Sequence, residues 1–244
     1  MRVHAVHELI EHRINNATKP FNARGAKVQR CLRCRVATKY CLCQFQPAPF
    51  QGFAAILLYS NNEVLKPSNT GRLIADICED SYAFEWQRTE MPDQLKRLLN
   101  DPAYQPILVF PCDYLLESNT VIEPSSVKGM VKIPLFIFLD ASWREARRIY
   151  RKSAYLHHLP CLSISEKSLS DYIMRKAVNE QQLATCEVAS LVLNHAGFTD
   201  AADTLQQWFE VIKESYMLTK TQGDKDFTRP KLSAFLNSSN AKDN

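Results

Sequence analysis

The residue best placed for chemistry in this sequence is Asp140, a carboxylate at the end of the apolar run 136–139. A continuous apolar run is typical of a strand that is buried on both faces of a parallel sheet. Open α/β sheets bind ligands outside the carboxyl ends of their strands, so an acid at this point can accept a proton or orient a nucleophile. Asp140 can equally cap a turn, and the pattern alone leaves both roles open.

The segment after Asp140 predicts a helix whose two faces differ in character. Ser142 followed by Glu145 is a capping-box pattern, which satisfies backbone N–H groups at a helix start. Trp143 falls on the apolar face of this helix. Four arginines, which we call the arginine stripe, fall on the other face: Arg144, Arg147, Arg148 and Arg151. The stripe is either a phosphate-binding surface or an ordinary solvated face.

Four cysteines lie within 13 residues at the spacing C-x2-C-x6-C-x-C, and we call them the cysteine cluster: Cys31, Cys34, Cys41 and Cys43. Four thiolates can close a tetrahedral shell around one zinc ion, and a filled shell is typical of a structural site rather than a catalytic one. Disulfides are disfavoured in a chain that has no secretion signal. Arg33, Arg35 and Lys39 surround the cluster, which suits a small RNA-contacting knuckle. The four other cysteines are predicted to be mostly buried small hydrophobic residues.

Apolar runs and helical periodicity alternate along the chain, which predicts an α/β fold with a mainly parallel sheet flanked by helices. The expected strands are 53–59, 84–86, 105–111, 136–139 and 159–164. The expected helices are 3–17, about 70–79, 91–100, about 182–195 and 200–217. We expect three regions: an N-terminal helix and zinc knuckle (1–50), an α/β catalytic domain (51–222) and a loose polar tail (223–244).

The charge of this 244-residue chain is unevenly distributed. Residues 1–50 carry a net charge of +7 and the remainder −3, so the basic section favours a polyanionic partner such as nucleic acid. No apolar run is long enough to span a bilayer and no signal peptide is evident, so we expect a cytoplasmic protein without a membrane or obligatory protein partner. Glycine-rich nucleotide motifs and a metal-binding histidine pair are not evident, and the six histidines look scattered.

Several stretches together resemble the DTW-domain family, the tRNA-uridine aminocarboxypropyltransferases. The family's D-x-T-W pattern matches Asp140-Ala141-Ser142-Trp143, where serine keeps the hydroxyl of threonine. The other matching stretches are the cysteine cluster, Asn69-Thr70-Gly71-Arg72-Leu73, Phe110-Pro111, Ser170-x-Tyr172-x-x-Arg175-Lys176 and Leu183-Ala184-Thr185-Cys186-Glu187. One departure is Ser60-Asn61 before Glu63, where the family pattern has a His-Pro pair.

The resemblance implies a SPOUT-like fold with a knotted cofactor site near the C-terminal half. It also implies transfer of the 3-amino-3-carboxypropyl group of S-adenosylmethionine to N3 of a uridine in tRNA, which releases methylthioadenosine. Asp140 is the expected catalytic residue, as base or as orienting group. The expected cofactor-binding residues are Phe110, Pro111, Leu139, Asp140, Trp143, Leu162, Tyr172, Arg175 and Thr185. For Trp143, packing beneath the site is the more common fate of such a residue. For Arg175, a surface salt bridge is an equal alternative to pairing with the methionine carboxylate.

Arg72 joins the arginine stripe and the basic residues of the cysteine cluster as an expected RNA-binding residue. Three alternatives stay open at this point. The protein can be a SPOUT-type RNA methyltransferase that uses the same cofactor, or a non-catalytic zinc module that binds RNA. The RNA target can also be ribosomal.

Overall fold

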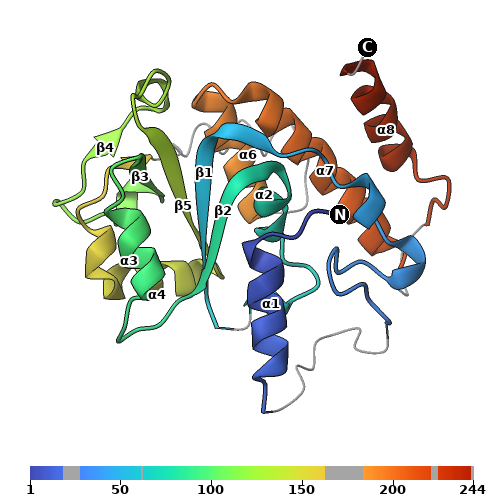
Figure 1. Cartoon of the computed structure of the whole chain (residues 1–244), viewed down its shortest axis with the longest axis horizontal. Coiled ribbons are helices and arrows are strands. Elements are labelled where there is room, and N and C mark those ends of the chain that lie inside the picture. The colour runs from blue at the N-terminus through green and yellow to red at the C-terminus, as the bar shows by residue number, and fades with distance from the viewer. Residues whose placement is uncertain (19–27, 62, 163–183, 221–224, 243–244) are drawn as a thin grey trace.

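A computed structural model describes residues 1–18, 28–61, 63–162, 184–220 and 225–242. Its centre is a six-stranded sheet in the order β2-β1-β5-β3-β6-β4, and every paired neighbour is parallel (Figure 1). The strands are β1 (Phe50–Tyr59), β2 (Cys78–Glu85), β3 (Tyr104–Val109), β4 (Val121–Ile122), β5 (Ile133–Asp140) and β6 (Cys161–Leu162). The predicted α/β class with a parallel sheet is confirmed.

Helices cover both faces of the sheet. They are α1 (Ala5–Asn15), α2 (Arg72–Ile77), α3 (Asp93–Leu99), α4 (Trp143–Lys152), α6 (Thr185–His195), α7 (Thr199–Met217) and α8 (Pro230–Lys242). In Figure 1, α3 and α4 lie on one side of the sheet, and α1, α2, α6 and α7 lie on the other. The buried residues accordingly form two hydrophobic clusters, one between the sheet and each helical layer.

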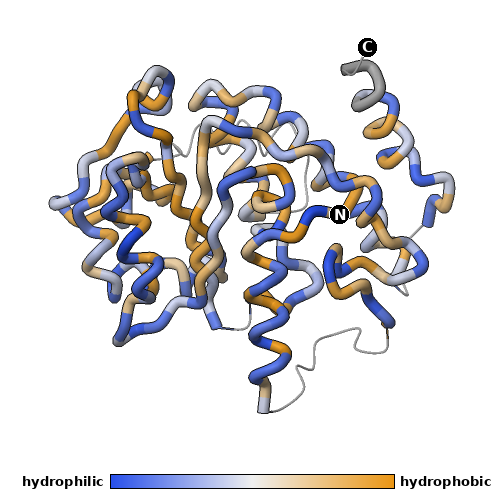
Figure 2. Tube along the Cα trace, viewed as in Figure 1, coloured by the Kyte–Doolittle hydropathy of each residue, from blue (hydrophilic) through white to orange (hydrophobic). Residues whose placement is uncertain are grey.

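Strand β1 shows why the central strands are apolar throughout. Phe53 and Leu57 contribute to the cluster under α2 and α7, whereas Ile56 and Leu58 contribute to the cluster under α3 and α4. Successive side chains of a strand point to opposite faces, so burial of both faces requires an unbroken apolar sequence. The hydropathy colouring of Figure 2 shows this apolar centre in orange.

The boundary between α2 and β2 differs from the sequence-based expectation. Helix α2 ends at Ile77 and β2 begins at Cys78, so neither a helix to about Glu79 nor a short strand at 84–86 describes this segment. Glu79 and Asp80 are exposed on β2, which forms an edge of the sheet. Pairing with β1 over most of its length, which local sequence does not reveal, decides that these polar residues are extended.

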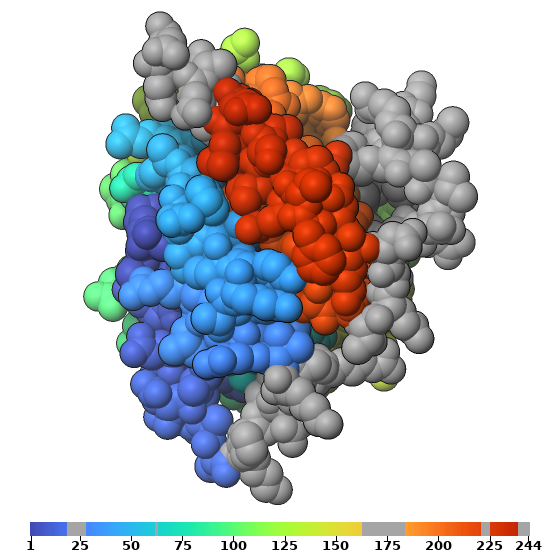
Figure 3. Space-filling model, turned by 90° about the vertical axis from the view of Figure 1, so that its right-hand side faces the viewer, coloured from blue at the N-terminus to red at the C-terminus, as the bar shows by residue number. Residues whose placement is uncertain are grey.

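The expectation of a loose tail is also wrong, because residues 230–242 form helix α8. Leu232 and Phe235 are buried, and the ring of Phe235 lies 5.6 Å from that of Trp208 in α7. Figure 3 shows α8, in red, lying against the body of the molecule. A short helix with few apolar residues is stabilised by docking rather than by its own propensity.

The N-terminal residues share the hydrophobic core of the α/β body. Val6 and Ile10 of α1 belong to the same cluster as Leu42, α2 and α7. Nη2 of Arg2 donates to the carbonyl oxygens of Ala75 and Cys78, at 2.8 and 2.9 Å. In the part of the chain that the structure describes, every helix is too short or too polar to cross a bilayer.

Candidate active site at the carboxyl edge of the sheet

Asp140 is the last residue of β5, at the edge toward which the β5 arrow points in Figure 1. It pairs with Tyr59, the last residue of β1, and the backbone N–H of Ser60 donates to the Asp140 carbonyl oxygen at 3.1 Å. The helices that follow these neighbouring strands, α2 and α4, lie on opposite faces of the sheet. Diverging connections of this kind open a crevice at the carboxyl ends of the strands.

The Asp140 carboxylate is 3% exposed and is held by two side chains from distant segments. Nδ2 of Asn69 donates to Oδ2 at 2.9 Å, and Oγ1 of Thr185 donates to Oδ1 at 3.0 Å. Burial raises the pKa of Asp140 to about 6, although the hydrogen bonds from Asn69 and Thr185 favour the charged form. Near neutral pH the group is therefore an ionised carboxylate with an increased affinity for a proton.

Both donors stand at helix starts, which explains their orientation. The side-chain Oδ1 of Asn69 accepts the backbone N–H of Arg72, the first residue of α2, at 3.2 Å, so the same amide contacts both the helix start and Asp140. Oε2 of Glu187 accepts the backbone N–H of Ala184 at 3.0 Å, which fixes the first turn of α6 around Thr185. Among the site residues proposed from sequence, Asn69 was missing. Its signals in the sequence were the polar segment before a helix and the family-like stretch Asn69-Thr70-Gly71-Arg72-Leu73.

The segments that meet at Asp140 are the ones that resemble the DTW-domain family in sequence. A model of the DTW domain matches residues 28–217, which is most of the chain. The chain belongs to the DTW-domain family. Among curated proteins, tRNA-uridine aminocarboxypropyltransferase 2 of Drosophila melanogaster is 23% identical over 171 residues. This match covers 67% of the present chain but only 65% of that protein, so the chain spans just under two thirds of this relative. No solved structure matches the chain.

The D-x-[ST]-W segment of this DTW domain forms the start of α4. Oε2 of Glu145 accepts from the Ser142 hydroxyl at 2.6 Å and from its backbone N–H at 3.3 Å, so the predicted cap is present. Trp143 does not pack beneath the site as expected, because its side chain is 40% exposed. It occupies the first turn, where it faces the loop after β3, and the core face of α4 is formed by Ala146, Ile149 and Tyr150.

The arginine stripe lies on the solvent side of α4. Arg144, Arg148 and Arg151 are exposed and Arg147 is half-buried. The guanidinium of Arg147 lies 5.1 Å from the ring centroid of Tyr114, and that of Arg148 lies 5.9 Å from that of Trp86. These cation–π contacts orient two of the four cations without neutralising them.

The other residues expected to bind the cofactor differ in how deeply they are buried. Phe110 and Leu162 are buried at the ends of β3 and β6, so their side chains belong to the core of the described structure. Pro111 and Leu139 are half-buried at the same edge. Tyr172 and Arg175 lie outside the described residues.

The cysteine cluster brings its four sulfur atoms within 4.8 Å of one another. The Sγ atoms of Cys31 and Cys43 are 3.4 Å apart, and those of Cys34 and Cys41 are 3.8 Å apart. A tetrahedral zinc ion with Zn–S bonds of about 2.3 Å requires sulfur separations of about 3.8 Å, so the cluster fits zinc. Burial raises the pKa of the Cys34 thiol to about 11, which a bound cation would reverse.

The basic residues around the cysteine cluster differ in exposure. Arg33 and Lys39 are exposed. Arg35 is half-buried, and its Nη2 donates to the carbonyl oxygen of Leu65 at 3.1 Å. Arg33 and Lys39 are thus the exposed cations of this group.

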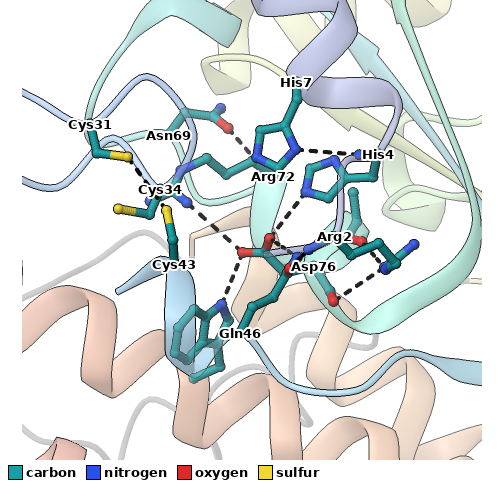
Figure 4. Close-up of polar contacts among 12 residues, drawn as sticks. Arg2, His4, His7, Cys31, Cys34, Cys43, Gln46, Asn69, Arg72 and Asp76 are labelled. Atoms are coloured by element: carbon teal, nitrogen blue, oxygen red, sulfur yellow. Dashed lines mark hydrogen bonds and ion pairs between the residues drawn. The ribbon is translucent and has the colours of Figure 1, made fainter. Parts of the chain in front are cut away.

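Arg72 is not a surface residue in this structure, and its expected RNA contact is therefore not supported. It is 2% exposed, and Nη1 lies 3.9 Å from Oδ2 of the buried Asp76. Its side chain lies between Asp76 and the cysteine cluster in the view of Figure 4. Because Arg72 is in the first turn of the buried helix α2, tertiary packing turns it inward.

Asp76 is the centre of a buried polar network (Figure 4). Its carboxylate is bonded to the side chains of His4 at 3.0 Å, Gln46 at 2.9 Å and Trp208 at 2.9 Å. Burial raises the pKa of Asp76, but His4, Arg72 and Trp208 outweigh this effect and hold the pKa below its usual value. The network therefore links the N-terminus, the segment after the cysteine cluster, α2 and α7 through one charge.

The expectation that the histidines are scattered is wrong for His4 and His7. Their rings stack at 3.8 Å, and with Asp76 they form a group whose ligand atoms lie within 4.8 Å. The carboxylate already accepts from several donors, and the Arg72 cation lies beside it. These contacts are typical of a structural cross-link rather than of a metal site.

A cavity of about 280 Å³ opens at the opposite edge of the sheet. Its lining includes Gly52 and Ile133, near the starts of β1 and β5, and Phe198 between α6 and α7. It is therefore separate from the site around Asp140.

Proposed function

We propose that this protein transfers the 3-amino-3-carboxypropyl group of S-adenosylmethionine to N3 of a uridine in tRNA, in the cytoplasm. The observation that carries the proposal is the buried Asp140 carboxylate held by Asn69 and Thr185, since each of the three residues comes from a different family-like segment. The name of the Drosophila relative supports the same reaction.

In the proposed reaction the protein orients the uridine and removes the N3 proton. When bound, S-adenosylmethionine supplies a carbon that is electrophilic because it is attached to a sulfonium. Asp140 accepts the N3 proton, and the N3 electron pair forms the new N–C bond as the C–S bond breaks. The bonding electrons of the C–S bond remain on sulfur in methylthioadenosine. Burial of Asp140 excludes water and increases its basicity.

The remaining parts of the proposal concern binding. The fold would be SPOUT-like with a knotted cofactor site, to which the ends of β3, β5 and β6 contribute Phe110, Pro111, Leu139 and Leu162. Tyr172, Arg175 and Thr185 would supply polar groups to the cofactor. The cysteine cluster would hold one structural zinc ion, and the exposed arginines of the stripe would contact phosphates. Such contacts position the RNA without reading its sequence.

The test is incubation of the purified chain with S-adenosylmethionine and an unmodified tRNA transcript, followed by mass spectrometry of the nucleosides and the small-molecule products. We expect aminocarboxypropyl-uridine and methylthioadenosine in equal amounts. Asp140→Asn should reduce turnover at least about 100-fold, as loss of a positioned base does. Asp203→Asn, at an exposed position of α7, is the matched control and should retain turnover.

Other outcomes would reject the proposal in different ways. Methyluridine with S-adenosylhomocysteine would identify a methyltransferase. RNA binding without measurable affinity for S-adenosylmethionine would identify a non-catalytic module. Near-normal turnover by Asp140→Asn would remove the proposed base.

A further inference from the structure

Two large aromatic side chains stand exposed at the same edge of the sheet as Asp140. Tyr114, in the short helical turn Cys112–Tyr114 after β3, is 42% exposed, and Trp143, at the start of α4, is 40% exposed. Their ring centroids are 5.3 Å apart and the rings are nearly perpendicular, at 77°. We call these two residues the aromatic pair. Trp208 is fully buried and Trp86 is half-buried, so Trp143 is the most exposed of the three tryptophans.

Trp143 is held in place from beneath. Its ring stacks on Phe110 at 5.9 Å with an interplanar angle of 24°, and Phe110 stacks on Tyr150 at 4.8 Å with an angle of 25°. The hydroxyl of Tyr150 is in turn fixed by Asn119 and by the backbone N–H of Leu116, which donates to it at 2.8 Å. The exposed indole is thus an ordered surface, and a ligand that stacks on it loses little conformational freedom.

Cationic side chains lie beside the aromatic pair. The guanidinium of Arg147 lies over the ring of Tyr114, and Arg144 and Arg148 are exposed on the same helix. Aromatic faces beside arginines match single-stranded nucleic acid, in which flat bases alternate with phosphates. This charge argues for a nucleic-acid occupant and against an apolar peptide or a neutral lipid surface.

We propose that the aromatic pair holds an unpaired nucleobase of the RNA substrate, stacked on the face of one ring and against the edge of the other. The inference rests on the proposed function, which brings RNA to this edge of the sheet. N3 of uridine lies on the Watson–Crick edge, so a uridine that presents N3 to Asp140 has left its base pair and stack. Because Trp143 begins the helix that follows Asp140, a base stacked on its indole lies at the same edge of the sheet as Asp140 and replaces part of the lost stacking.

The first experiment measures binding of an unmodified tRNA transcript by fluorescence anisotropy, without turnover. Trp143→Ala and Tyr114→Ala should each raise Kd roughly 5- to 100-fold, the range for loss of one stacked base. Trp143→Phe and Tyr114→Phe keep a ring and should recover most of the affinity. Phe227→Ala removes a 62% exposed ring elsewhere and should leave Kd unchanged.

Salt dependence separates stacking from charge. Since a base carries no charge, the alanine variants should lower the affinity at every salt concentration and leave the slope of log K against log salt unchanged. A flattened slope, or wild-type affinity in both alanine variants, would overturn the inference.

A second measurement tests the competing occupant, the adenine of S-adenosylmethionine. The affinity for S-adenosylmethionine without RNA, measured calorimetrically, should be the same in wild type and Trp143→Ala. Loss of this affinity would assign the indole to the cofactor and overturn the inference. If the alanine variants lose RNA affinity but the wild type forms no aminocarboxypropyl-uridine, only the proposed function is refuted. If the wild type forms the product but both alanine variants keep wild-type RNA affinity, only this inference is refuted.

Discussion

The Asp140 carboxylate occupies the space into which any side chain at Gly71 would extend. A Cβ atom at position 71 would lie 1.7 Å from Oδ2 of Asp140. The backbone of Gly71 has φ −58° and ψ −33°, an ordinary helical conformation, so the glycine is needed for space and not for backbone freedom. The third residue of the Asn69-Thr70-Gly71 segment is therefore a steric requirement of the candidate site.

Gly71→Ala should disable the site while the protein stays folded. The added methyl group must displace the Asp140 carboxylate, and a displacement of about 1 Å can cost about 100-fold in rate. Product formation with S-adenosylmethionine and tRNA measures the loss, and circular dichroism verifies the fold. Wild-type turnover in this variant would mean that the position of the carboxylate is unimportant.

Asp140 should make stability and activity respond to pH in opposite directions. Its folded-state pKa is raised to about 6 from 3.8, so its stabilising contribution is complete below about pH 4 and is lost as the pH rises through 6. At pH 7.5 the ionised group costs up to about 3 kcal/mol. Asp140→Asn should therefore melt several degrees above wild type at pH 7.5, and the difference should shrink toward pH 5.

Turnover should rise with pH through about 6, because only the ionised carboxylate accepts the N3 proton. Asp203→Asn provides the control for both measurements. If Asp140→Asn melts at the same temperature as wild type at pH 7.5, burial of the ionised carboxylate does not destabilise the fold.

Asp76 should be far more important for stability than an exposed acid. Asp76→Ala leaves Arg72 and His4 without their buried partner, which is expected to cost about 3–5 kcal/mol. Urea unfolding at pH 7 measures this free energy. Asp80→Ala, at an exposed position of β2, should change it by less than about 0.5 kcal/mol. Equal effects of the two substitutions would show that the polar network does not stabilise the fold.

The cysteine cluster should bind one zinc ion per chain. Removal of zinc by a chelator should lower the melting temperature, because the metal cross-links the segment 31–43, whose Cys34, Val36 and Leu42 belong to the core. Cys34→Ser should lose the metal, whereas Cys112→Ser, at an exposed cysteine outside the cluster, should keep it. Atomic absorption of the purified protein provides the count, and a metal-free wild type with an unchanged melting temperature would contradict the assignment.

The arginine stripe should determine how steeply RNA binding depends on salt. Arg144→Gln and Arg151→Gln should each reduce the slope of log K against log salt by about 1 if each arginine contacts a phosphate. Lys213→Gln, at an exposed position of α7, is the control and should not alter the slope. An unchanged slope in the arginine variants would mean that the stripe is an ordinary solvated surface without phosphate contacts.

Features that depend on short stretches of chain followed from the local amino-acid pattern. The apolar run before Asp140 predicted a strand buried on both faces, and the spacing of Ser142 and Glu145 predicted the helix start that the structure contains. The spacing of the cysteine cluster likewise predicted a group that fits one metal ion. Each of these features is decided by neighbours within a few residues, so local periodicity was sufficient.

Which distant groups meet, and which side chains turn inward, depends on the packing of the whole chain. Asn69 and Thr185 contact Asp140 across 71 and 45 positions of the chain. Arg72 turns into the core and Trp143 turns outward, against the expectation for each. Helix α8 depends on docking of Phe235 against Trp208. Burial is a property of the assembled layers, because the free energy of placing a side chain depends on what the rest of the chain packs against it.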